Sequence, residues 1–423
     1  MDRIEASRTP TDSLLADHFR ARRYIGAKDR GAIAETVYGY LRRRAQLDWW
    51  IDRKGWGKVA RNPRGRMIVL LLTERTVPAS DLPHLFDGGK YHPAHMSEDE
   101  TGLAAALPGL QRLDHPAQPP WVAANYPEWL HPHLVATFGD QVVPEMTALD
   151  APAPLDLRVN VLKGTRADAI KALTDDDIAA TPTPWSPVGL RLARRVALQT
   201  IGAWKDGLVE VQDEGSQLVA LLVDAKPGMR VVDFCAGAGG KTLAIAATMA
   251  NKGHVVACDI SAPRLEGATK RLRRAGVHNV ERRQLADERD PWVKKHQKSY
   301  DRVVADVPCT GTGAWRRNAD GRWRLQPVDL EELVALQARI VDSCCRLVKK
   351  GGRLVYATCS VLREENEAQV ERFLEAHPEF HLLSADEIWP EGVTRPDAGP
   401  MLRLTPARHA TDGFFAAVLE RVA

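Results

Sequence analysis

The sequence predicts an α/β protein in which a doubly wound, mostly parallel sheet follows an all-α domain. In the first third of the chain, apolar residues recur every three or four positions, which is the period of amphipathic helices. From residue 228 onward, short β-branched runs alternate with helical stretches, and this alternation implies right-handed crossovers in a parallel sheet. We therefore expect a helical domain at residues 1–140, a linker with a small α+β subdomain at 141–225 and an α/β domain at 226–423.

The opening third contains three amphipathic stretches, DSLLADHFRARRYIG, KDRGAIAETVYGYLRRRAQLDWWIDRKG and PRGRMIVLLLTERT. Residues 1–66 contain sixteen Lys and Arg against eight Asp and Glu, although the whole chain has a net charge of only +3. Such a local excess fits either a solvated face or a surface that binds a polyanion, and the sequence leaves both open.

The rest of the chain contains the predicted strands. LDLRVNVLKGTR predicts one strand, and VALQTIGAWKDGLVEVQDEGSQLVALLV predicts a strand pair that leads to a helix. The strands of the α/β domain are RVVDF, HVVACDI, NVERRQL, DRVVADV and RLVYATC, and DGFFAAVLERV predicts a late antiparallel strand.

Composition excludes several classes of protein. No apolar run approaches the ~20 residues of a membrane span, and MDRIEASRTP has charges where a signal peptide needs an apolar core. We therefore expect a cytoplasmic protein without a membrane partner. The six cysteines include no CxxC pair and no companion His-x3-5-His motif, so we expect neither a disulfide framework nor a metal site.

The stretch VVDFCAGAGGKT places glycines between a strand and a helix, where the backbone can approach a ligand closely. A phosphate-binding P-loop would need glycine where Cys235 stands, and a dinucleotide fingerprint would need glycine at Thr242. The remaining class is S-adenosylmethionine. Acids fit its site: Asp233 lies in the first strand, Asp259 ends the second where ribose hydroxyls would bind, and Asp287 follows the third, near the adenine amino group.

Two cysteines, Cys309 and Cys359, directly follow predicted strands. Because ligands of open α/β sheets bind beyond the carboxyl ends of the strands, both thiols should lie beside the cofactor. Carbon 5 of a pyrimidine lacks a lone pair, and a thiolate that adds to carbon 6 makes carbon 5 nucleophilic. Asp306 could hold the base through its amino group and ring nitrogen 3. The residues alone do not decide which cysteine attacks.

The other four cysteines are expected to be ordinary apolar residues: Cys235, Cys258, Cys344 and Cys345.

The stretch GAWRRNADGRWRL follows the Cys309 turn and interleaves aromatic with basic residues, which is typical of single-stranded nucleic-acid contacts. Its candidate RNA contacts are Trp315, Arg316, Arg317, Arg322, Trp323 and Arg324. The alternative is a basic surface loop with buried tryptophans. A second backbone contact is predicted at Arg158, Lys163 and Arg166.

Several motifs together resemble the Sun family of RNA cytosine carbon-5 methyltransferases, in particular its RsmB-like members. They are VQDEGSQLV, FCAGAGGKT, ADVPCTGTG, the arginine pair 316–317, YATCSVLREENEAQV and DGFF, and the likeness covers residues 155–423. KDRGAIAETVYGYLRRR is similar to the NusB-like RNA-binding domain of those members. The resemblance implies a Rossmann-like S-adenosylmethionine methyltransferase domain at 226–423.

The resemblance also implies roles for individual residues. Cys359 would be the nucleophile, Cys309 would help to release the product, and Asp306 would complete the catalytic set. Ala238 and Ala319 stand where members of the family commonly have proline. The implied contacts of S-adenosyl-L-methionine are Cys235, Ala236, Gly237, Ala238, Gly239, Gly240, Lys241, Asp259, Asp287 and Asp306.

We therefore expect a monomeric, metal-free enzyme that forms 5-methylcytosine in small-subunit ribosomal RNA. Two alternatives stay open. One is the same reaction on transfer RNA, and the other is a non-catalytic RNA-binding or assembly factor that keeps the methyltransferase fold as a scaffold.

Overall fold

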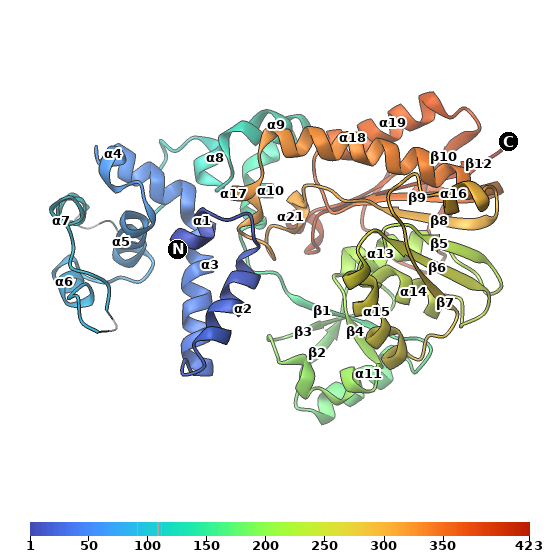
Figure 1. The fold of residues 1–423 in the computed structure, drawn as a ribbon, viewed down its shortest axis with the longest axis horizontal. Helices are drawn as coiled ribbons and strands as arrows, with labels where there is room; N and C mark the ends of the chain where they lie inside the picture. The colour runs from blue at the N-terminus through green and yellow to red at the C-terminus, as the bar shows by residue number, and fades with distance from the viewer. Residues whose placement is uncertain (91, 108–109, 111) are drawn as a thin grey trace. The chain divides into compact units, whose positions relative to one another are not determined.

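The computed structural model describes residues 1–90, 92–107, 110 and 112–423 (Figure 1). These residues form two compact units. The helical unit comprises Met1–Ala151 and Trp315–Leu325, and the α/β unit comprises Pro152–Ala314 and Gln326–Ala423. The helical part therefore extends beyond residue 140, and it includes a segment that the sequence analysis assigned to the α/β domain. Within the described residues, no helix is long and apolar enough to cross a membrane.

The helical unit confirms the three predicted helices, which are α2, α3 and α5. Local signals set where its helices begin: the Asn62 side chain accepts hydrogen bonds from two backbone N–H groups of α5, and Ser97 and Glu100 form a capping box on α7. The elements are α1 (Asp2–Glu5), α2 (Thr11–Ala21), α3 (Ala27–Arg53), α4 (Gly57–Ala60), α5 (Pro63–Thr73), η1 (Ala79–Asp81), α6 (Leu82–Leu85), α7 (Glu98–Ala105), α8 (Pro120–Ala123), η2 (Glu128–Leu130), α9 (His131–Phe138), η3 (Gly139–Gln141), α10 (Val142–Ala148) and α17 (Gly321–Arg324).

A small antiparallel sheet begins the α/β unit, and within the described residues its strand order is β2-β3-β1-β4. The elements in this part of the chain are β1 (Leu155–Val159), α11 (Arg166–Asp175), β2 (Ala180–Pro182), β3 (Gly189–Leu192), η4 (Leu198–Thr200), α12 (Gly202–Lys205), β4 (Val209–Val211) and α13 (Glu214–Leu222). The first strand of the predicted pair was wrong. That stretch forms η4 and α12. Its apolar residues reach the core of the small sheet, Ile201 from the extended residue between the two helices and Ala203 from α12.

The larger sheet has eight strands in the described part of the chain, in the order β10-β12-β9-β8-β5-β6-β7, with β11 paired to β12. β5 to β9 are parallel, and β12 pairs antiparallel with β9, so the predicted doubly wound sheet and its late strand are confirmed. The strands are β5 (Arg230–Asp233), β6 (His254–Asp259), β7 (Val280–Gln284), β8 (Tyr300–Asp306), β9 (Val348–Thr358), β10 (Phe380–Leu383), β11 (Leu402–Leu404) and β12 (Phe414–Arg421). The other elements are α14 (Gly240–Thr248), α15 (Ala262–Ala275), α16 (Pro291–Lys295), η5 (Thr312–Ala314), α18 (Pro327–Cys344), η6 (Cys345–Leu347), η7 (Arg363–Glu365), α19 (Glu367–Ala376), α20 (Ala385–Ile388) and α21 (Pro406–His409).

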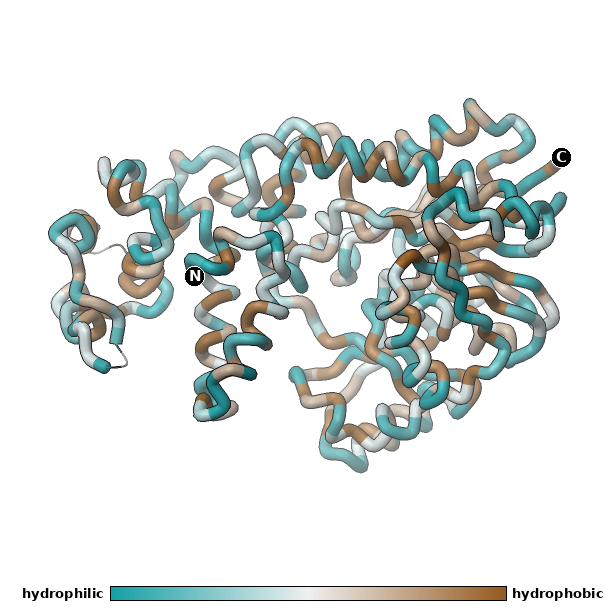
Figure 2. Tube along the Cα trace, in the orientation of Figure 1, coloured by the Kyte–Doolittle hydropathy of each residue, from teal (hydrophilic) through white to brown (hydrophobic). Residues whose placement is uncertain are grey.

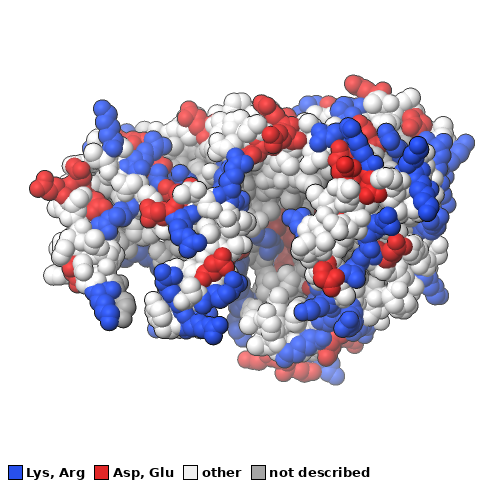
Figure 3. Space-filling view, viewed as in Figure 1, with Lys and Arg blue, Asp and Glu red and all other residues white. Residues whose placement is uncertain are grey.

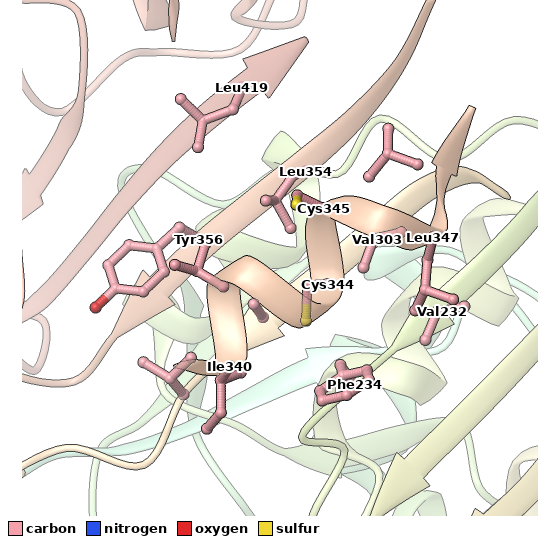
Figure 4. Packing of buried hydrophobic residues seen from close by; sticks show 14 of the residues in the cluster. Val232, Phe234, Val303, Ile340, Cys344, Cys345, Leu347, Leu354, Tyr356 and Leu419 are labelled. Carbon is pink, nitrogen blue, oxygen red and sulfur yellow. The ribbon is translucent and has the colours of Figure 1, made fainter. Parts of the chain in front are cut away.

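Apolar residues run along the strands of this sheet, as Figure 2 shows, and successive residues of a strand face opposite sides. On one face Val303 packs with residues of α16, α18 and α19, and on the other Val304 packs with residues of α13 and α14. Cys344 and Cys345 lie inside the first of these clusters (Figure 4), and Cys258 is buried there too. These three cysteines are core residues, as predicted.

Candidate active site

The connection between β5 and α14 forms a tight glycine turn at the carboxyl end of the sheet. Gly237 and Gly239 have positive φ angles of +54° and +82°, which side chains rarely adopt. The Gly239 N–H donates to the Ala236 carbonyl over 2.8 Å, and the Ala236 N–H donates to the Cys258 carbonyl over 2.8 Å. The turn is therefore fastened to the neighbouring strand β6.

Asp259 ends β6 and orders this turn. Its carboxylate accepts hydrogen bonds of 2.8 Å from the backbone N–H groups of Gly237 and Ser261. A Cβ atom added at Gly237 would meet no atom within 4 Å, so the turn borders open space. A glycine turn at a helix amino terminus, with an acid from the next strand beside it, fits S-adenosylmethionine, whose ribose hydroxyls need an acceptor.

The other predicted cofactor contacts lie on or near the same edge of the sheet. Asp287 follows β7, is exposed, and accepts from the Arg289 N–H over 2.7 Å. The Ala238 carbonyl accepts from Arg271 over 2.7 Å. Cys235 begins the turn, partly buried against the core. The cofactor roles of these residues stay predictions.

Asp233 is the acid that the sequence places in the first strand, and its side chain is buried. It is 1% exposed beneath the turn, where the Thr242 hydroxyl donates to its carboxylate over 2.6 Å. Burial raises the pKa of Asp233 to about 6. Asp233 therefore supports α14 from below.

Buried Lys241 and partly exposed Asp306 form an ion pair that links the glycine turn to the end of β8. Lys241 Nζ lies 2.7 Å from Asp306 Oδ2, and the Phe414 ring lies 5.3 Å from the same nitrogen. Although burial alone would lower it, the pKa of Lys241 is raised because the Asp306 carboxylate stabilises the ammonium. Asp306 is thus held in one orientation at the same edge of the sheet.

The structure brings together the two cysteines that follow β8 and β9. The sulfur atoms of Cys309 and Cys359 lie 3.4 Å apart, and both side chains are partly exposed. The Gly313 N–H donates to the Cys359 carbonyl over 3.0 Å, which ties the two turns together. The hydrogen bond to Cys359, burial and nearby negative charge raise the pKa of the Cys309 thiol well above its usual value. A thiolate at Cys309 is therefore disfavoured in this position.

Two buried polar residues beside the thiols were not singled out from the sequence. Glu365 accepts from the Thr310 N–H, and Asn366 accepts from the Thr358 hydroxyl, so each holds a residue next to one cysteine. The available signal was the run REENE directly after the Cys359 turn, in which polar residues follow a strand end.

Arg158 holds the first residue of the helix that follows the glycine turn. It lies on β1 and is 4% exposed, and burial lowers its pKa to about 10. Its Nη1 donates to the Gly240 carbonyl over 2.8 Å and to the side-chain carbonyl of Gln212. These contacts and the burial of its guanidinium do not favour a phosphate contact, and the predicted RNA contact at Arg158 stays a prediction.

The aromatic and basic segment after Cys309 is packed into the helical unit. Trp315 is 1% exposed and Arg316 is 4% exposed, which does not favour base stacking or phosphate binding, and these two RNA contacts stay predictions. Arg322 is fully buried in an ion pair with Asp150. Arg317 is partly exposed, and its predicted RNA contact stays a prediction.

Comparisons with known proteins identify the relatives of this chain. Residues 220–420 match the family model "16S rRNA methyltransferase RsmB/F", and residues 126–199 match the ferredoxin-like domain of RsmF/B-like methyltransferases. A probable ribosomal RNA small subunit methyltransferase B of Synechocystis is 31% identical, covering 94% of this chain and 92% of the relative. Ribosomal RNA small subunit methyltransferase B of Yersinia pseudotuberculosis is 32% identical, covering 93% of this chain and 91% of the relative.

A solved structure, that of PH0851, extends the likeness to the whole fold. It is 26% identical with a TM-score of 0.77, and the match covers 99% of this chain and 96% of that chain. Sequence identity above 30% over nearly the full length, together with the match of the family model over the larger sheet, shows the family of this chain. It belongs to the RsmB/F family of 16S rRNA methyltransferases.

Proposed function

We propose that this protein uses S-adenosylmethionine to form 5-methylcytosine in small-subunit ribosomal RNA, with Cys359 as the nucleophile. The observation that carries the proposal is the pair of facing thiols, whose sulfur atoms lie 3.4 Å apart at the carboxyl end of the sheet. Two facing thiols suit a reaction that needs one attacking sulfur and one proton carrier.

The reaction needs a nucleophile because carbon 5 of cytosine has no lone pair. The Cys359 thiolate adds to carbon 6, and the electrons displaced from the carbon 5–carbon 6 bond make carbon 5 nucleophilic. S-adenosylmethionine supplies the methyl group, and the glycine turn with Asp259 and Asp287 would hold it. Asp306, fixed by Lys241, would hold the base at its amino group and ring nitrogen 3.

RNA as the partner finds support on the helical unit. Where α2 meets α3, Tyr24 is 77% exposed and is surrounded in sequence by the exposed Arg22, Arg23 and Lys28. Figure 3 shows Lys and Arg atoms gathered at this end of the two helices. An exposed aromatic ring among basic side chains suits a base and its phosphates, and we propose this surface as an RNA contact.

Replacing each active-site thiol tests the mechanism. Cys359→Ala should lower methyl transfer to ribosomal RNA by a thousandfold or more, on the order of other nucleophile deletions, because no adduct can form. Cys309→Ala should instead accumulate a covalent protein–RNA adduct that survives a denaturing gel. Cys344→Ala, in the packed core, is the matched control and should retain activity.

Full activity of the Cys359→Ala variant would contradict the proposal. Bisulfite sequencing of ribosomal and transfer RNA from cells that lack the protein identifies the substrate. Loss of 5-methylcytosine from transfer RNA alone would favour the alternative substrate, and no loss together with no binding of S-adenosylmethionine would favour a scaffold.

A further inference from the structure

Glu365 lies fully buried next to the turn that carries Cys309. Its carboxylate accepts hydrogen bonds from the Thr310 N–H over 2.8 Å and from the Thr310 hydroxyl over 2.5 Å. The Gln337 amide donates to the same carboxylate over 2.9 Å and to the Pro308 carbonyl over 2.9 Å. Glu365, directly and through Gln337, thus fixes the residues on both sides of Cys309.

The next residue, Asn366, performs the same task for Cys359. Its side chain accepts from the Thr358 hydroxyl over 2.5 Å and donates to the Ser360 carbonyl over 3.0 Å. Two consecutive residues therefore hold the neighbours of both cysteines, one cysteine each. This arrangement keeps the two thiols facing each other, but it does not by itself make them chemically different.

The difference lies in charge. The donors described above for the Glu365 carboxylate are neutral amide and hydroxyl groups, so none of these donors offsets a negative charge on it. The titratable groups that influence Cys309 are Glu365 on η7 and, on and after β9, Tyr356 and Cys359. A fixed negative charge beside one thiol disfavours a second negative charge on it.

We propose that Glu365 is the positioning residue that keeps Cys309 a neutral thiol facing Cys359, so that Cys359 alone attacks the base. The proposal rests on the proposed function. During release, the carbon-5 proton leaves, its electrons restore the carbon 5–carbon 6 bond, and the carbon 6–sulfur bond breaks. Cys309 gives its proton to the departing Cys359 sulfur, 3.4 Å away, and takes the carbon-5 proton in return.

Thiol alkylation tests the inference without RNA or cofactor. Protein carrying Glu365→Gln is treated with iodoacetamide across pH 6 to 10, and labelling of each cysteine is followed by mass spectrometry. Loss of the charge should lower the pH midpoint for Cys309 by about one unit, which raises its labelling rate at pH 8 about tenfold. Glu371→Gln, which removes an exposed carboxylate on α19, is the control and should leave both rates unchanged.

Glu365→Asp keeps the charge and should restore slow labelling of Cys309, which guards against misfolding of the glutamine variant. Equal acceleration at Cys309 and Cys359 in the glutamine variant, or no acceleration at all, would overturn the inference, because a merely structural residue loosens both turns together. Failure of the wild-type protein to methylate RNA would overturn the proposed function while leaving the labelling result interpretable. In methylation assays, the glutamine variant should accumulate the covalent adduct.

Discussion

Asp233 is a buried carboxylate whose energetic role follows from its surroundings. Thr242 donates to one oxygen, and among the described residues the other oxygen has no hydrogen-bond partner. Burial therefore raises the pKa of this group from 3.8 to about 6. Because the folded state holds the proton more tightly, Asp233 contributes stability that is fully present below about pH 4 and is lost as pH rises through 6.

Asp233→Asn should remove this pH dependence. The difference in free energy of unfolding, variant minus wild type, should rise by about 1.5 kcal/mol from pH 5 to pH 8. The reason is that the wild type must ionise a buried group over this range. Urea unfolding at the two pH values measures the gain. Glu266→Gln, at an exposed site, should show no such gain, and an equal gain in both variants would contradict the assignment.

At the residue scale, one rule located much of the site from sequence. Residues that directly follow parallel strands meet at one edge of the sheet, and this rule singled out Asp259, Asp306 and both thiols. The rule did not single out Glu365, because the importance of this residue depends on its burial. A run of acidic residues in a sequence does not show which side chain points inward. Trp315 shows a second limit of sequence patterns. An aromatic residue beside arginines gives the same pattern whether its side chain is packed or exposed.

At the scale of elements, the small sheet supports the glycine turn between β5 and α14. Arg158 on β1 bonds to the first residue of α14, and Gln212, just after β4, completes the contact. The edge of one sheet thereby fixes the helix amino terminus that the glycine turn leads into. Sequence patterns did not predict this support, because a strand residue's partner on another element depends on the tertiary fold.

Arg158→Met should weaken binding of S-adenosylmethionine about tenfold, because loss of a buried charge-assisted bond of about 1.5 kcal/mol loosens the turn. Titration calorimetry measures the change in Kd, and Lys171→Ala on the exposed side of α11 serves as the control. If affinity for RNA fell while cofactor affinity stayed the same, Arg158 would be an RNA contact after all.

The same subdomain shows the limit of element prediction. The helices with long amphipathic periods and the parallel strands were predicted correctly, because burial on one or both faces leaves a strong pattern. The stretch around Ile201 was wrong because a few apolar residues at short spacing fit a strand and a helical turn equally well.

At the scale of the whole molecule, charge is distributed unevenly, and the basic end of α2 and α3 should contribute to RNA affinity. Replacing Arg22, Arg23 and Lys28 by Ala should reduce the salt dependence of RNA binding, lowering the slope of log K against log salt by about 2. Filter binding at several salt concentrations measures this slope. The same change at Arg53, Lys54 and Lys58, at the other end of α3 or beyond it, is the control, and an equal reduction there would contradict a specific contact.

The sequence predicted two kinds of domain but treated each as a continuous stretch of chain. The structure differs because residues 315–325 leave the α/β unit and complete the helical one. Trp323 donates to the Leu41 carbonyl over 2.7 Å, and the Thr11 N–H donates to Asp320 over 2.9 Å, so the segment is fastened to two helices. No local sequence pattern predicts that a segment crosses in this way from one unit to the other, because the crossing is defined by contacts between residues about three hundred positions apart.

This crossing limits how the two units can be exchanged between relatives. A chimera that joins foreign helices at residue 151 would lose Asp150 and leave Arg322 buried without its counter-charge. Trp315 and Trp323, which stay with the recipient chain, would meanwhile meet foreign helices in place of those against which they pack. Recombination of these proteins therefore has to transfer two separate pieces of gene at once, which favours inheritance of both units as one indivisible block.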